Sequence, residues 1–276
     1  MSRVWMITGA SRGLGRAFTE EAVRNGDQVI ATVRKINPAD SLLTNENVLT
    51  VIMDVTKQDE VKAAVEAGLQ KFGRIDVLIN NAGFGMSGAF EEISDEELRY
   101  LMDTNYFGVA NVTREDLPAM RKQGSGMILN VSSQAGAMGF LGSSAYCSSK
   151  YAVVGLSEAL SMELEPFGIQ VASILPGSFR TDFRDDSSMK HARQSLSAYE
   201  GSQVHAARDF LAANNHKQEG DPEKAAKFLY KIIDSGTLPK RILIGKKCCE
   251  AVRDYLKGRI AEIDSYIEAS SQTDFE

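Results

Sequence analysis

The chain has few cysteines, prolines and tryptophans. Its 276 residues include three cysteines, six prolines and one tryptophan. Three cysteines cannot form the disulfide framework of a small secreted domain, and adjacent Cys248 and Cys249 match no usual metal-ligand spacing. We therefore expect a reducing, cytoplasmic setting and no metal site. Cys147, directly after Tyr146, has two interpretations: a small packed helix residue or a reactive thiol.

The chain also lacks an excess of basic residues and any long apolar run. Its formal net charge is -6, which argues against nucleic-acid and anionic-membrane partners because no basic face is implied. No apolar run reaches the ~18 residues that a bilayer-spanning helix needs. The N-terminal segment MSRVWMITGASRG enters a strand pattern at once, so we expect no signal or transit peptide. These absences favour a small-molecule partner.

Short apolar runs alternate with longer amphipathic segments along most of the chain. Continuously apolar runs are typical of strands buried on both faces of a parallel sheet. Strands that alternate with helices of this length indicate βαβ units, so we predict an α/β fold, a doubly wound Rossmann-type, seven-stranded parallel sheet with helices on both faces. The expected strands are 4–8, 28–33, 48–53, 76–80, 126–131, 169–175 and 241–245, and the expected helices are 14–25, 57–72, 94–120, 145–165 and 222–235.

Residues 178–220 interrupt this alternation, because no strand pattern occurs within them. So long an insertion in a compact domain is usually functional, and we interpret it as a substrate lid. The last segment, 247–268, is predicted to be a helix that packs at the end of the domain. No repeat, low-complexity tract or linker divides the chain, which predicts a single catalytic domain over residues 1–276.

A glycine-rich turn follows the first predicted strand. Gly9, Gly13 and Gly15 stand in TGASRGLG, directly before a helix predicted to start near Arg16. Glycines permit positive φ and close approach to a phosphate, and a helix N-terminus offers unpaired N–H groups to a pyrophosphate. The spacing G-x-x-x-G-x-G differs from the G-x-G-x-x-G fingerprint. Its place after a first strand nevertheless favours dinucleotide binding over a purely structural turn.

The end of the second predicted strand indicates which dinucleotide is bound. An acidic residue here would bind a ribose 2′-hydroxyl and repel a 2′-phosphate. Val33, Arg34 and Lys35 occupy the position, and Arg12 in the glycine turn could converge with Arg34 on the same ribose. Two cations and no carboxylate favour NADP(H) over NAD, the alternative being that both arginines are merely solvated.

Asp54 and the pair formed by Tyr146 and Lys150 also carry candidate chemistry. Asp54, at the end of the third predicted strand, could bond an adenine amino group or act in a turn or helix cap, as Thr56 could equally do. Tyr146 and Lys150 lie one helical turn apart and therefore project from the same face. A phenol has a pKa near ~10, and a neighbouring cation lowers it toward neutral pH, as acid–base catalysis requires.

Together these residues resemble a known family. TGASRGLG, Asp54, NNAG (80–83), Asn105, NVSS with Ser133, the Tyr146/Lys150 pair and PG (176–177) occur in the order and at the approximate spacings of the short-chain dehydrogenase/reductase family. The resemblance covers residues 4 to about 181. The tail, with GDPEKAAK, RILIG and SQTDFE, resembles the 17β-hydroxysteroid dehydrogenase-like and retinol-dehydrogenase-like branch, whose features many carbonyl reductases share.

The resemblance implies a catalytic tetrad of Asn105, Ser133, Tyr146 and Lys150. Tyr146 is implied as the general acid/base. Ser133 bonds the reacting oxygen, and family spacing, with the serine thirteen residues before the tyrosine, selects it over Ser132. Lys150 is implied to lower the pKa of Tyr146 and to hold the nicotinamide ribose. Asn105 is implied to anchor a water that relays protons to Lys150.

The cofactor contacts extend along the same motifs. In NNAG, Asn81, Ala82 and Gly83 are implied to line the adenosine-ribose side, whereas Asn80 braces the sheet. Residues after the sixth strand are implied to contact the nicotinamide amide. The predicted cofactor-binding residues are Gly9, Ser11, Arg12, Gly13, Leu14, Gly15, Arg34, Asp54, Val55, Asn81, Ala82, Gly83, Tyr146, Lys150, Pro176, Gly177 and Thr181.

Three functions remain to be compared. The first is an NADPH-dependent reductase of a ketone or aldehyde, with a fairly apolar substrate indicated by Met138, Phe140, Phe179 and Phe183. The second is NAD-dependent oxidation of an alcohol, sterol or retinol. The third is a non-catalytic NADP-sensing protein, which would typically lack the tyrosine or lysine. The family also implies a homo-oligomer, a dimer or tetramer, formed through the helices at 94–120 and 145–165.

Overall fold

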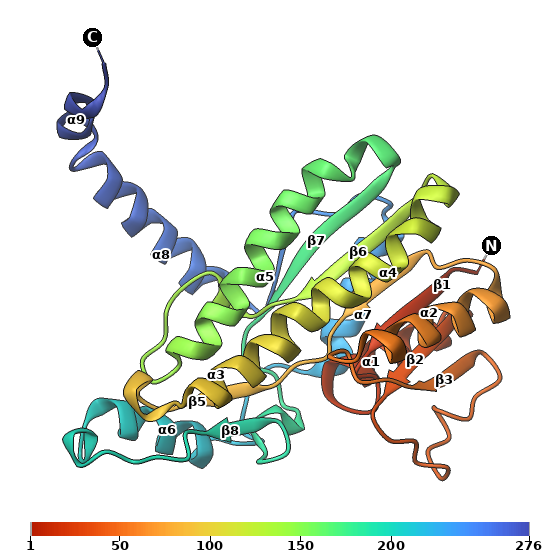
Figure 1. Ribbon diagram of the computed structural model, residues 1–276, viewed down its shortest axis with the longest axis horizontal. Coiled ribbons are helices and arrows are strands. Elements are labelled where there is room, and N and C mark those ends of the chain that lie inside the picture. Colours follow the sequence, from red (N-terminus) through yellow and green to blue (C-terminus); the bar gives the residue numbers. More distant parts are fainter. Residues whose placement is uncertain (1, 276) are drawn as a thin grey trace.

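The computed structural model describes residues 2–275, and its centre is a seven-stranded parallel sheet between two helical layers (Figure 1). The fold class predicted from the sequence is confirmed. The order across the sheet is β3-β2-β1-β4-β6-β7-β9. The strands are β1 (Val4–Thr8), β2 (Gln28–Val33), β3 (Val48–Ile52), β4 (Val77–Asn80), β6 (Gly126–Val131), β7 (Ile169–Pro176) and β9 (Arg241–Ile244).

Strand β1 illustrates why these apolar runs form a central sheet. Successive side chains point to opposite faces, so Trp5 and Ile7 join one apolar cluster while Val4 and Met6 join the other. All four are at most 2% exposed. Such a strand is stable only when helices cover both faces, which is the environment of a parallel sheet.

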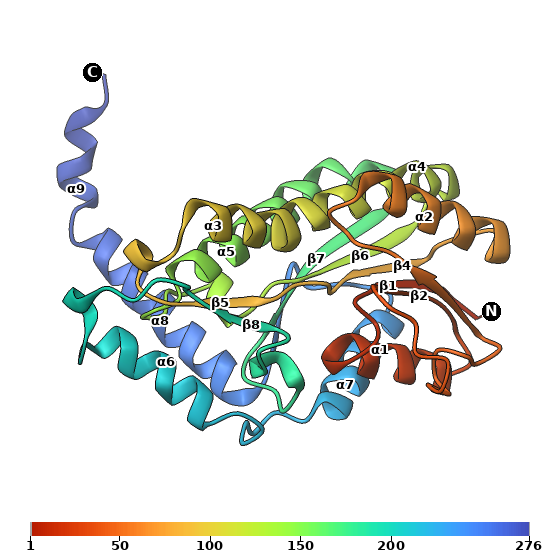
Figure 2. The same cartoon turned by 60° about the horizontal axis from the view of Figure 1, so that its bottom comes forward.

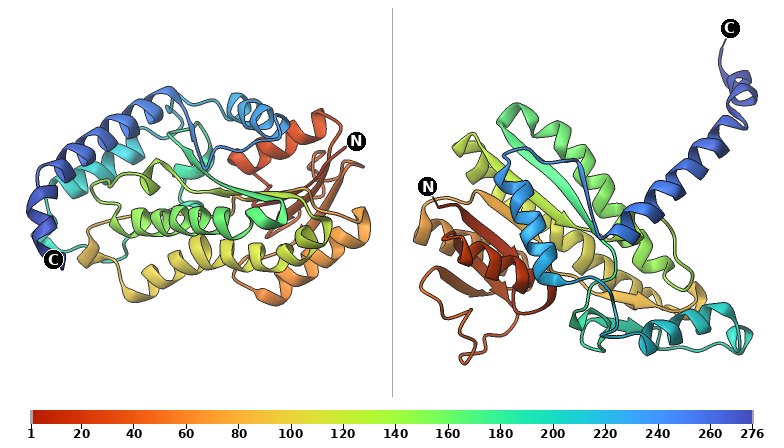
Figure 3. Two further views of the ribbon diagram at one scale, coloured as in Figure 1. Left: turned by 90° about the horizontal axis from the view of Figure 1, so that it is seen from above. Right: turned by 180° about the vertical axis from the view of Figure 1, so that it is seen from behind.

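Two layers of helices provide this cover. Helices α1 (Gly13–Arg24) and α7 (Pro222–Asp234) pack together over one face. Helices α2 (Gln58–Phe72), α4 (Gly108–Gln123) and α5 (Ser144–Glu163) cover the other (Figure 3). The strand order reverses between β1 and β4, so their carboxyl ends border a crevice of the kind in which doubly wound folds bind ligands.

We name residues 178–220 the lid after their predicted role, and this segment contains a strand that the sequence did not predict. Residues 189–191 form β8 (Met189–His191), which pairs in parallel with β5 (Gly85–Ser87) just after the NNAG turn. Helix α6 (Gln203–Ala213) follows, and Figure 2 shows it beyond this small sheet, on the outer side of the molecule. The expectation that 178–220 has no strand is wrong, because three residues are too few to give an alternating pattern.

The helix predicted at 94–120 is interrupted. Helix α3 (Asp95–Met102) passes into a π-helical turn over residues 103–107 before α4 begins at Gly108. Ser94 caps α3, its hydroxyl accepting from the Glu97 N–H at 3.3 Å. A π turn inserts one extra residue per turn, and apolar periodicity does not reveal it.

The last predicted helix extends away from the sheet. Helix α8 (Lys246–Asp264) buries Cys248 and Val252 against the body, and every residue from 256 to 275 is exposed, including short α9 (Ile267–Ser270). The expectation that this segment packs at the end is therefore correct only for its first turns (Figure 1). Between residues 2 and 275, no helix combines the length and hydropathy needed to cross a membrane.

Candidate active site

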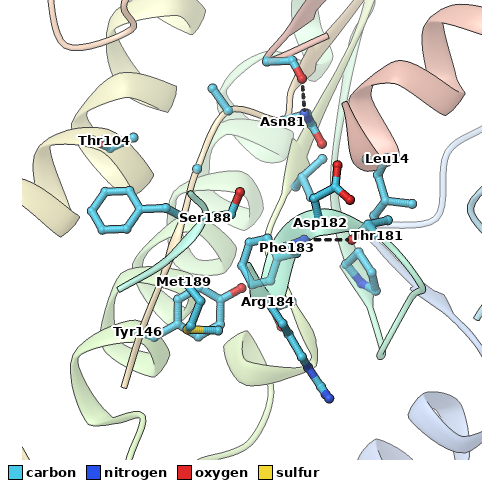
Figure 4. A pocket seen from close by; sticks show the side chains of 18 of the residues that line it. Leu14, Asn81, Thr104, Tyr146, Thr181, Asp182, Phe183, Arg184, Ser188 and Met189 are labelled. Atoms are coloured by element: carbon cyan, nitrogen blue, oxygen red, sulfur yellow. Dashed lines mark hydrogen bonds between the residues drawn. The ribbon is translucent and has the colours of Figure 1, made fainter. Parts of the chain in front are cut away.

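A cavity of about 970 Å³ opens at the carboxyl ends of the strands. The glycine turn, the end of β2, the NNAG turn, the start of α5 and the lid all contribute to its wall. In Figure 4, Leu14, Asn81 and Thr181 lie on one side of the cavity and Tyr146 with Met189 on the other. A cavity of this size lies within the range typical of small-molecule and cofactor sites.

Glycines let this turn pack directly against the NNAG turn, because a side chain at Gly9 or Gly15 would collide with that turn. Gly9 has φ +66°, and a Cβ atom on it would approach the Ala82 Cα to 3.1 Å. Gly13 also has positive φ and begins α1, whose N–H groups face the turn. A Cβ on Gly15 would collide with the Asn81 side chain. The turn therefore has the shape that a dinucleotide pyrophosphate needs.

The NNAG turn is fastened to the glycine turn by one hydroxyl. Thr8 Oγ1 accepts from the N–H groups of both Asn81 and Ala82 at 2.9 Å, and Asn81 Nδ2 donates to the Thr8 carbonyl oxygen at 2.9 Å. Asn80 instead bonds Thr113 and Asn130 inside the core, at 2.9 and 2.8 Å. Asn80 thus braces the sheet, as predicted, while the next residues line the cavity.

The predicted adenosine end contains Asp54, Val55 and Arg34 in the cavity wall. Asp54 Oδ1 accepts from both the N–H and the hydroxyl of Thr56, at 2.9 and 2.8 Å. Asp54 is therefore a turn residue, one of its two predicted roles, and it still borders the cavity. Arg34 is exposed and makes no hydrogen bond or ion pair with any residue between 2 and 275.

Arg12 is directed differently from the expected convergence with Arg34. Its Nη1 donates to Ser187 Oγ at 2.7 Å and its Nη2 to the Ser187 carbonyl oxygen at 3.1 Å. Ser187 belongs to the lid, so Arg12 joins the glycine turn to the lid in this structure. The sequence could not reveal a contact between residues 175 positions apart.

Tyr146 and Ser133 lie together in the cavity wall. Burial raises the pKa of Tyr146 above its ordinary value, and hydrogen bonding with Ser133 partly offsets the rise. The hydroxyl of Ser132 instead donates to the Lys150 carbonyl oxygen at 2.8 Å and is buried. Both serines border the cavity, but the Ser132 hydroxyl is engaged by the backbone of α5, whereas Ser133 lies beside Tyr146. Burial also raises the pKa of the Cys147 thiol, which favours the packed interpretation of that residue.

Lys150 is 4% exposed, and burial lowers its pKa to about 8. Its Nζ donates to the Val131 carbonyl oxygen at 2.9 Å and lies 5.8 Å from the centroid of the Tyr146 ring. The lysine is therefore beside the tyrosine, as predicted. The pKa of Tyr146 nevertheless lies above its ordinary value because burial dominates, so the expected lowering by Lys150 is not seen among these side chains.

Asn105 lies in the π turn and is fully buried. Its Nδ2 donates to the Phe84 carbonyl oxygen at 2.9 Å and to Ser149 Oγ at 3.1 Å, and its Oδ1 accepts from the Phe84 N–H at 3.0 Å. A Cβ on Gly83 would come within 3.0 Å of this Oδ1. Asn105 therefore holds the segment that follows the NNAG turn against α5 and does not itself line the cavity.

The segment after β7 completes the wall with Pro176, Gly177 and Thr181. A Cβ on Gly177 would approach the Cys248 Cβ to 2.9 Å, so glycine is needed where α8 crosses this segment. Of the predicted catalytic and cofactor-binding residues, only Gly15 and Asn105 lie behind the wall rather than in it, and Met138, expected beside the substrate, packs instead against a separate apolar cluster with Leu175. Gly15 and Asn105 both touch residues that line the cavity.

The sequence analysis missed much of the apolar part of the wall. Phe84 and Met86 follow the NNAG turn, and the lid adds Met189, Phe210 and Leu211. A Cβ on Gly85, between the first two, would collide with Met189 at 2.6 Å, so the glycine lets the lid strand pack closely. The signal for Phe84 and Met86 was their position next to a motif, whereas the lid residues had none.

These features define a class of protein: a Rossmann-type oxidoreductase that binds a dinucleotide at the glycine turn. A sequence model of the family described as short chain dehydrogenase matches residues 3–192. The chain therefore belongs to the short-chain dehydrogenase/reductase family, whose members bind a nicotinamide cofactor.

Individual relatives agree with this assignment. The chain is 39% identical over 266 residues to the oxidoreductase BOA17 of Botryotinia fuckeliana, covering 95% of this chain and 94% of that protein. It is 36% identical over 243 residues to a 3-ketodihydrosphingosine reductase of Bacteroides thetaiotaomicron, covering 88% of each.

Solved structures are also similar. A short-chain dehydrogenase from Streptomyces avermitilis has a TM-score of 0.91 and 37% identity, with both chains fully covered. ElxO with NADP bound has a TM-score of 0.71 and 27% identity, covering 88% of this chain and 96% of that one. A Burkholderia phymatum family member in complex with NAD has a TM-score of 0.76 and 26% identity, covering 91% and 92%.

Proposed function

We propose that this protein is an NADPH-dependent reductase of apolar ketones or aldehydes, able to run in reverse as an alcohol dehydrogenase. One observation carries the proposal: Tyr146 stands beside Ser133 in the wall of a cavity that also contains the glycine turn and Lys150. A tyrosine that stays protonated at neutral pH can donate its proton, as carbonyl reduction requires.

The proposed chemistry uses the hydroxyls of Tyr146 and Ser133 at the carbonyl oxygen. The nicotinamide, when bound, supplies the hydride. As the hydride arrives at carbon, negative charge develops on oxygen, and the Ser133 hydroxyl stabilises it by donating a hydrogen bond. Tyr146 then donates its proton to that oxygen, giving the alcohol. Lys150, buried beside the tyrosine ring, is the source of positive charge that would stabilise the resulting phenolate.

The tetrad roles of Lys150 and Asn105 are part of the same proposal. Lys150 would also hold the nicotinamide ribose, and Asn105 would position the site. Because the Asn105 side chain already bonds Phe84 and Ser149, we assign it the positioning of the segment that follows the NNAG turn against α5. The water relay that the family implies stays a prediction.

Arg34 supports NADP(H) as the cofactor. It stands exposed at the end of β2, beside Lys35, and no carboxylate follows the strand where a ribose 2′-hydroxyl would need one. A guanidinium without a protein partner is suited to bidentate recognition of a 2′-phosphate. Arg12, engaged with Ser187, would reach the same phosphate only after leaving the lid.

The apolar wall supports the substrate class. The rings of Tyr146 and Phe183 lie 6.0 Å apart, and Met189 packs beside Phe183 over Gly85. Lid residues Phe210 and Leu211 extend this wall away from the glycine turn. An apolar group attached to the carbonyl would be buried there. The similar 3-ketodihydrosphingosine reductase, by its name, acts on a ketone with a long apolar chain.

The decisive experiment is oxidation of NADPH with a panel of ketones and aldehydes of increasing apolar size. Wild type is expected to turn over the apolar members, and Tyr146→Phe to lose at least ~100-fold in kcat with unchanged NADPH affinity. Retained turnover in Tyr146→Phe would refute the proposal. Tight NADPH binding with no turnover of any carbonyl would instead favour the NADP-sensing protein.

The cofactor assignment is tested separately by comparing the affinities for NADPH and NADH. Arg34→Ala is expected to weaken NADPH binding by ~10–100-fold and to leave NADH binding nearly unchanged, since only NADPH carries the 2′-phosphate. Lys62→Ala, an exposed cation on α2, is the matched control. Equal affinities in wild type, with no effect of Arg34→Ala, would favour the NAD-dependent alcohol dehydrogenase.

The remaining expectations belong to this proposal. We propose that the chain forms a single catalytic domain in which residues 178–220 act as the substrate lid, and that it works in the cytoplasm. Family-type oligomers would form through α4 and α5. Exposed apolar side chains such as Tyr151 and Met162, both on α5, are consistent with that surface being covered.

A further inference from the structure

The C-terminal arm, defined as residues 253–275, has almost no support from the rest of the protein. Every residue from 256 to 275 is exposed, and the arm projects from the body in Figure 1 and in the right-hand view of Figure 3. An isolated helix of this length is marginal in water, because its nucleation is unfavourable and tertiary packing normally stabilises it. Gly258 in its interior weakens it further.

An apolar stripe runs along the exposed arm. Leu256, Ile260 and Ile263 follow one another at spacings of four and three residues and are 42%, 59% and 47% exposed. These three residues lie on α8; Ile267, four residues later and 54% exposed, lies on α9 beyond the turn at 265–266. Alternating spacings of four and three are those of the contact positions of a coiled coil. A stripe of this kind is expected to be covered by another helix.

The charges of the arm and α8 are arranged unfavourably for a lone helix. Residues 246–259 contain five basic and two acidic residues, whereas 260–275 contain four acidic and no basic ones. Basic residues near a helix N-terminus and acidic residues near its C-terminus oppose the helix dipole. The arrangement becomes favourable beside a second helix of opposite direction, whose acidic half then lies against the basic half.

We propose that the arms of two copies of this protein pair in antiparallel orientation along this stripe. Ile260 then packs against Ile263 of the partner subunit, and Leu256 lies toward the partner subunit's Ile267. Lys257 and Asp264 are two turns apart and lie on the same flank of the stripe. Antiparallel pairing brings Lys257 close to Asp264 of the partner subunit, and the same contact repeats across the two-fold axis.

The contacts within one subunit leave Lys257 and Asp264 available to pair with another subunit. Lys257 approaches Asp254 of its own helix at 3.5 Å, but both side chains are more than half exposed, so this pair is weak. Asp264 forms no ion pair with any residue between 2 and 275. Parallel pairing would place the two basic halves together, and an anionic membrane would repel the acidic half. The charge distribution therefore selects a second copy in antiparallel orientation.

A helix pair this short is expected to bury less than the ~1,200 Å² of a standard interface, so the association should depend on protein concentration. Sedimentation velocity of the full chain across a concentration series measures it. Replacing both Ile260 and Ile263 by Ser is expected to lower the number of copies per particle, with carbonyl reduction unchanged because neither residue lines the cavity. Identical sedimentation of this variant and wild type would overturn the proposal.

Charge reversal tests the orientation. Lys257→Glu and Asp264→Lys are each expected to weaken association ~5-fold or more, and the double variant to restore it, because only antiparallel arms place these two residues opposite each other. Glu262→Lys is the matched control, since Glu262 pairs with Arg259 of its own helix and faces away from the stripe. A double variant no better than the single ones would refute antiparallel pairing, whatever the outcome of the activity assays.

Discussion

Glu92 Oε1 lies 2.8 Å from Nε2 of His205, although 113 residues separate them in the chain. Glu92 is 2% exposed and follows β5, while His205 is on lid helix α6 and 9% exposed. The same carboxylate accepts from the Leu196 N–H at 2.9 Å and the Ala89 N–H at 3.1 Å. Burial alone would raise the pKa of Glu92, but these bonds outweigh it and lower the pKa. A buried carboxylate therefore fastens the lid to the body.

The first prediction concerns this fastening. Glu92→Gln leaves a single acceptor oxygen, which cannot serve the Ala89 N–H on one side and the Leu196 N–H on the other, and it removes the negative charge beside His205, so the lid should open more often. We expect KM for an apolar carbonyl to rise ~10-fold and amide hydrogen exchange within 189–213 to accelerate, with NADPH affinity unchanged. Glu91→Gln is the control, because Glu91 bonds Tyr199 of the lid at the exposed surface. Equal effects of the two variants would contradict a special role for the buried contact.

The second prediction concerns Ser133. Hydrogen bonding with Ser133 lowers the pKa of Tyr146, so Ser133→Ala should raise that pKa further and move the alkaline limb of the pH–rate profile upward. The loss of a donor to the developing oxyanion should also reduce kcat by ~100-fold. Ser132→Ala, which loses a bond to the Lys150 carbonyl oxygen, should affect stability more than the profile. An unchanged pH–rate profile in Ser133→Ala would refute the proposed role of Ser133 beside Tyr146.

The third prediction links Lys150 to stability. Burial lowers its pKa to about 8 in the folded protein, and it titrates near ~10.4 when unfolded. Between these values the unfolded state binds more protons, so the free energy of unfolding gains a favourable contribution as pH rises from about 8 to ~10.4. In Lys150→Met this contribution should vanish, while carbonyl reduction is lost. Chemical denaturation of both proteins at pH 7.5 and 10 measures it; an identical pH dependence would be contrary evidence.

The fourth prediction concerns Asp116 of α4, a fully buried carboxyl group whose two oxygens have no hydrogen-bond partner among residues 2–275. Burial raises its pKa to about 7. The folded state therefore binds more protons than the unfolded state between pH ~3.9 and about 7, and the free energy of unfolding falls over this range. Asp116→Asn should remove this dependence and stabilise the protein by roughly 2–4 kcal/mol at pH 7.5.

Thermal unfolding at pH 5 and pH 7.5 distinguishes an effect of Asp116 ionisation from a change in stability that does not depend on pH. The advantage of Asp116→Asn should be small at pH 5 and large at pH 7.5. Glu66→Gln, an exposed carboxylate on α2, should show no such difference. An unfolding temperature below that of wild type for Asp116→Asn at pH 7.5 would contradict the prediction. It would mean that the carboxyl group makes a stabilising contact that the amide cannot replace.

The amino-acid sequence by itself determined the sheet and the local chemistry. Continuous apolar runs such as 4–7 predict strands buried on both faces, because apolar side chains are removed from water whatever their neighbours. The turn at Gly9 and the one-turn spacing of Tyr146 and Lys150 depend only on nearby residues, so their geometry could be predicted. Asn80 and its neighbour Asn81 take the different directions that the family resemblance implies.

Only the tertiary structure decided the features that depend on distant contacts. The pairing of β5 with β8, the engagement of Arg12 by Ser187 and the lid contact of Glu92 join residues about a hundred or more positions apart. The π turn around Asn105 gives no apolar period, and the raised pKa of Tyr146 reflects burial rather than composition. Local sequence sets backbone conformation and residue chemistry. Burial and long-range packing instead set the protonation states, the contacts of the lid and the exposure of the C-terminal arm.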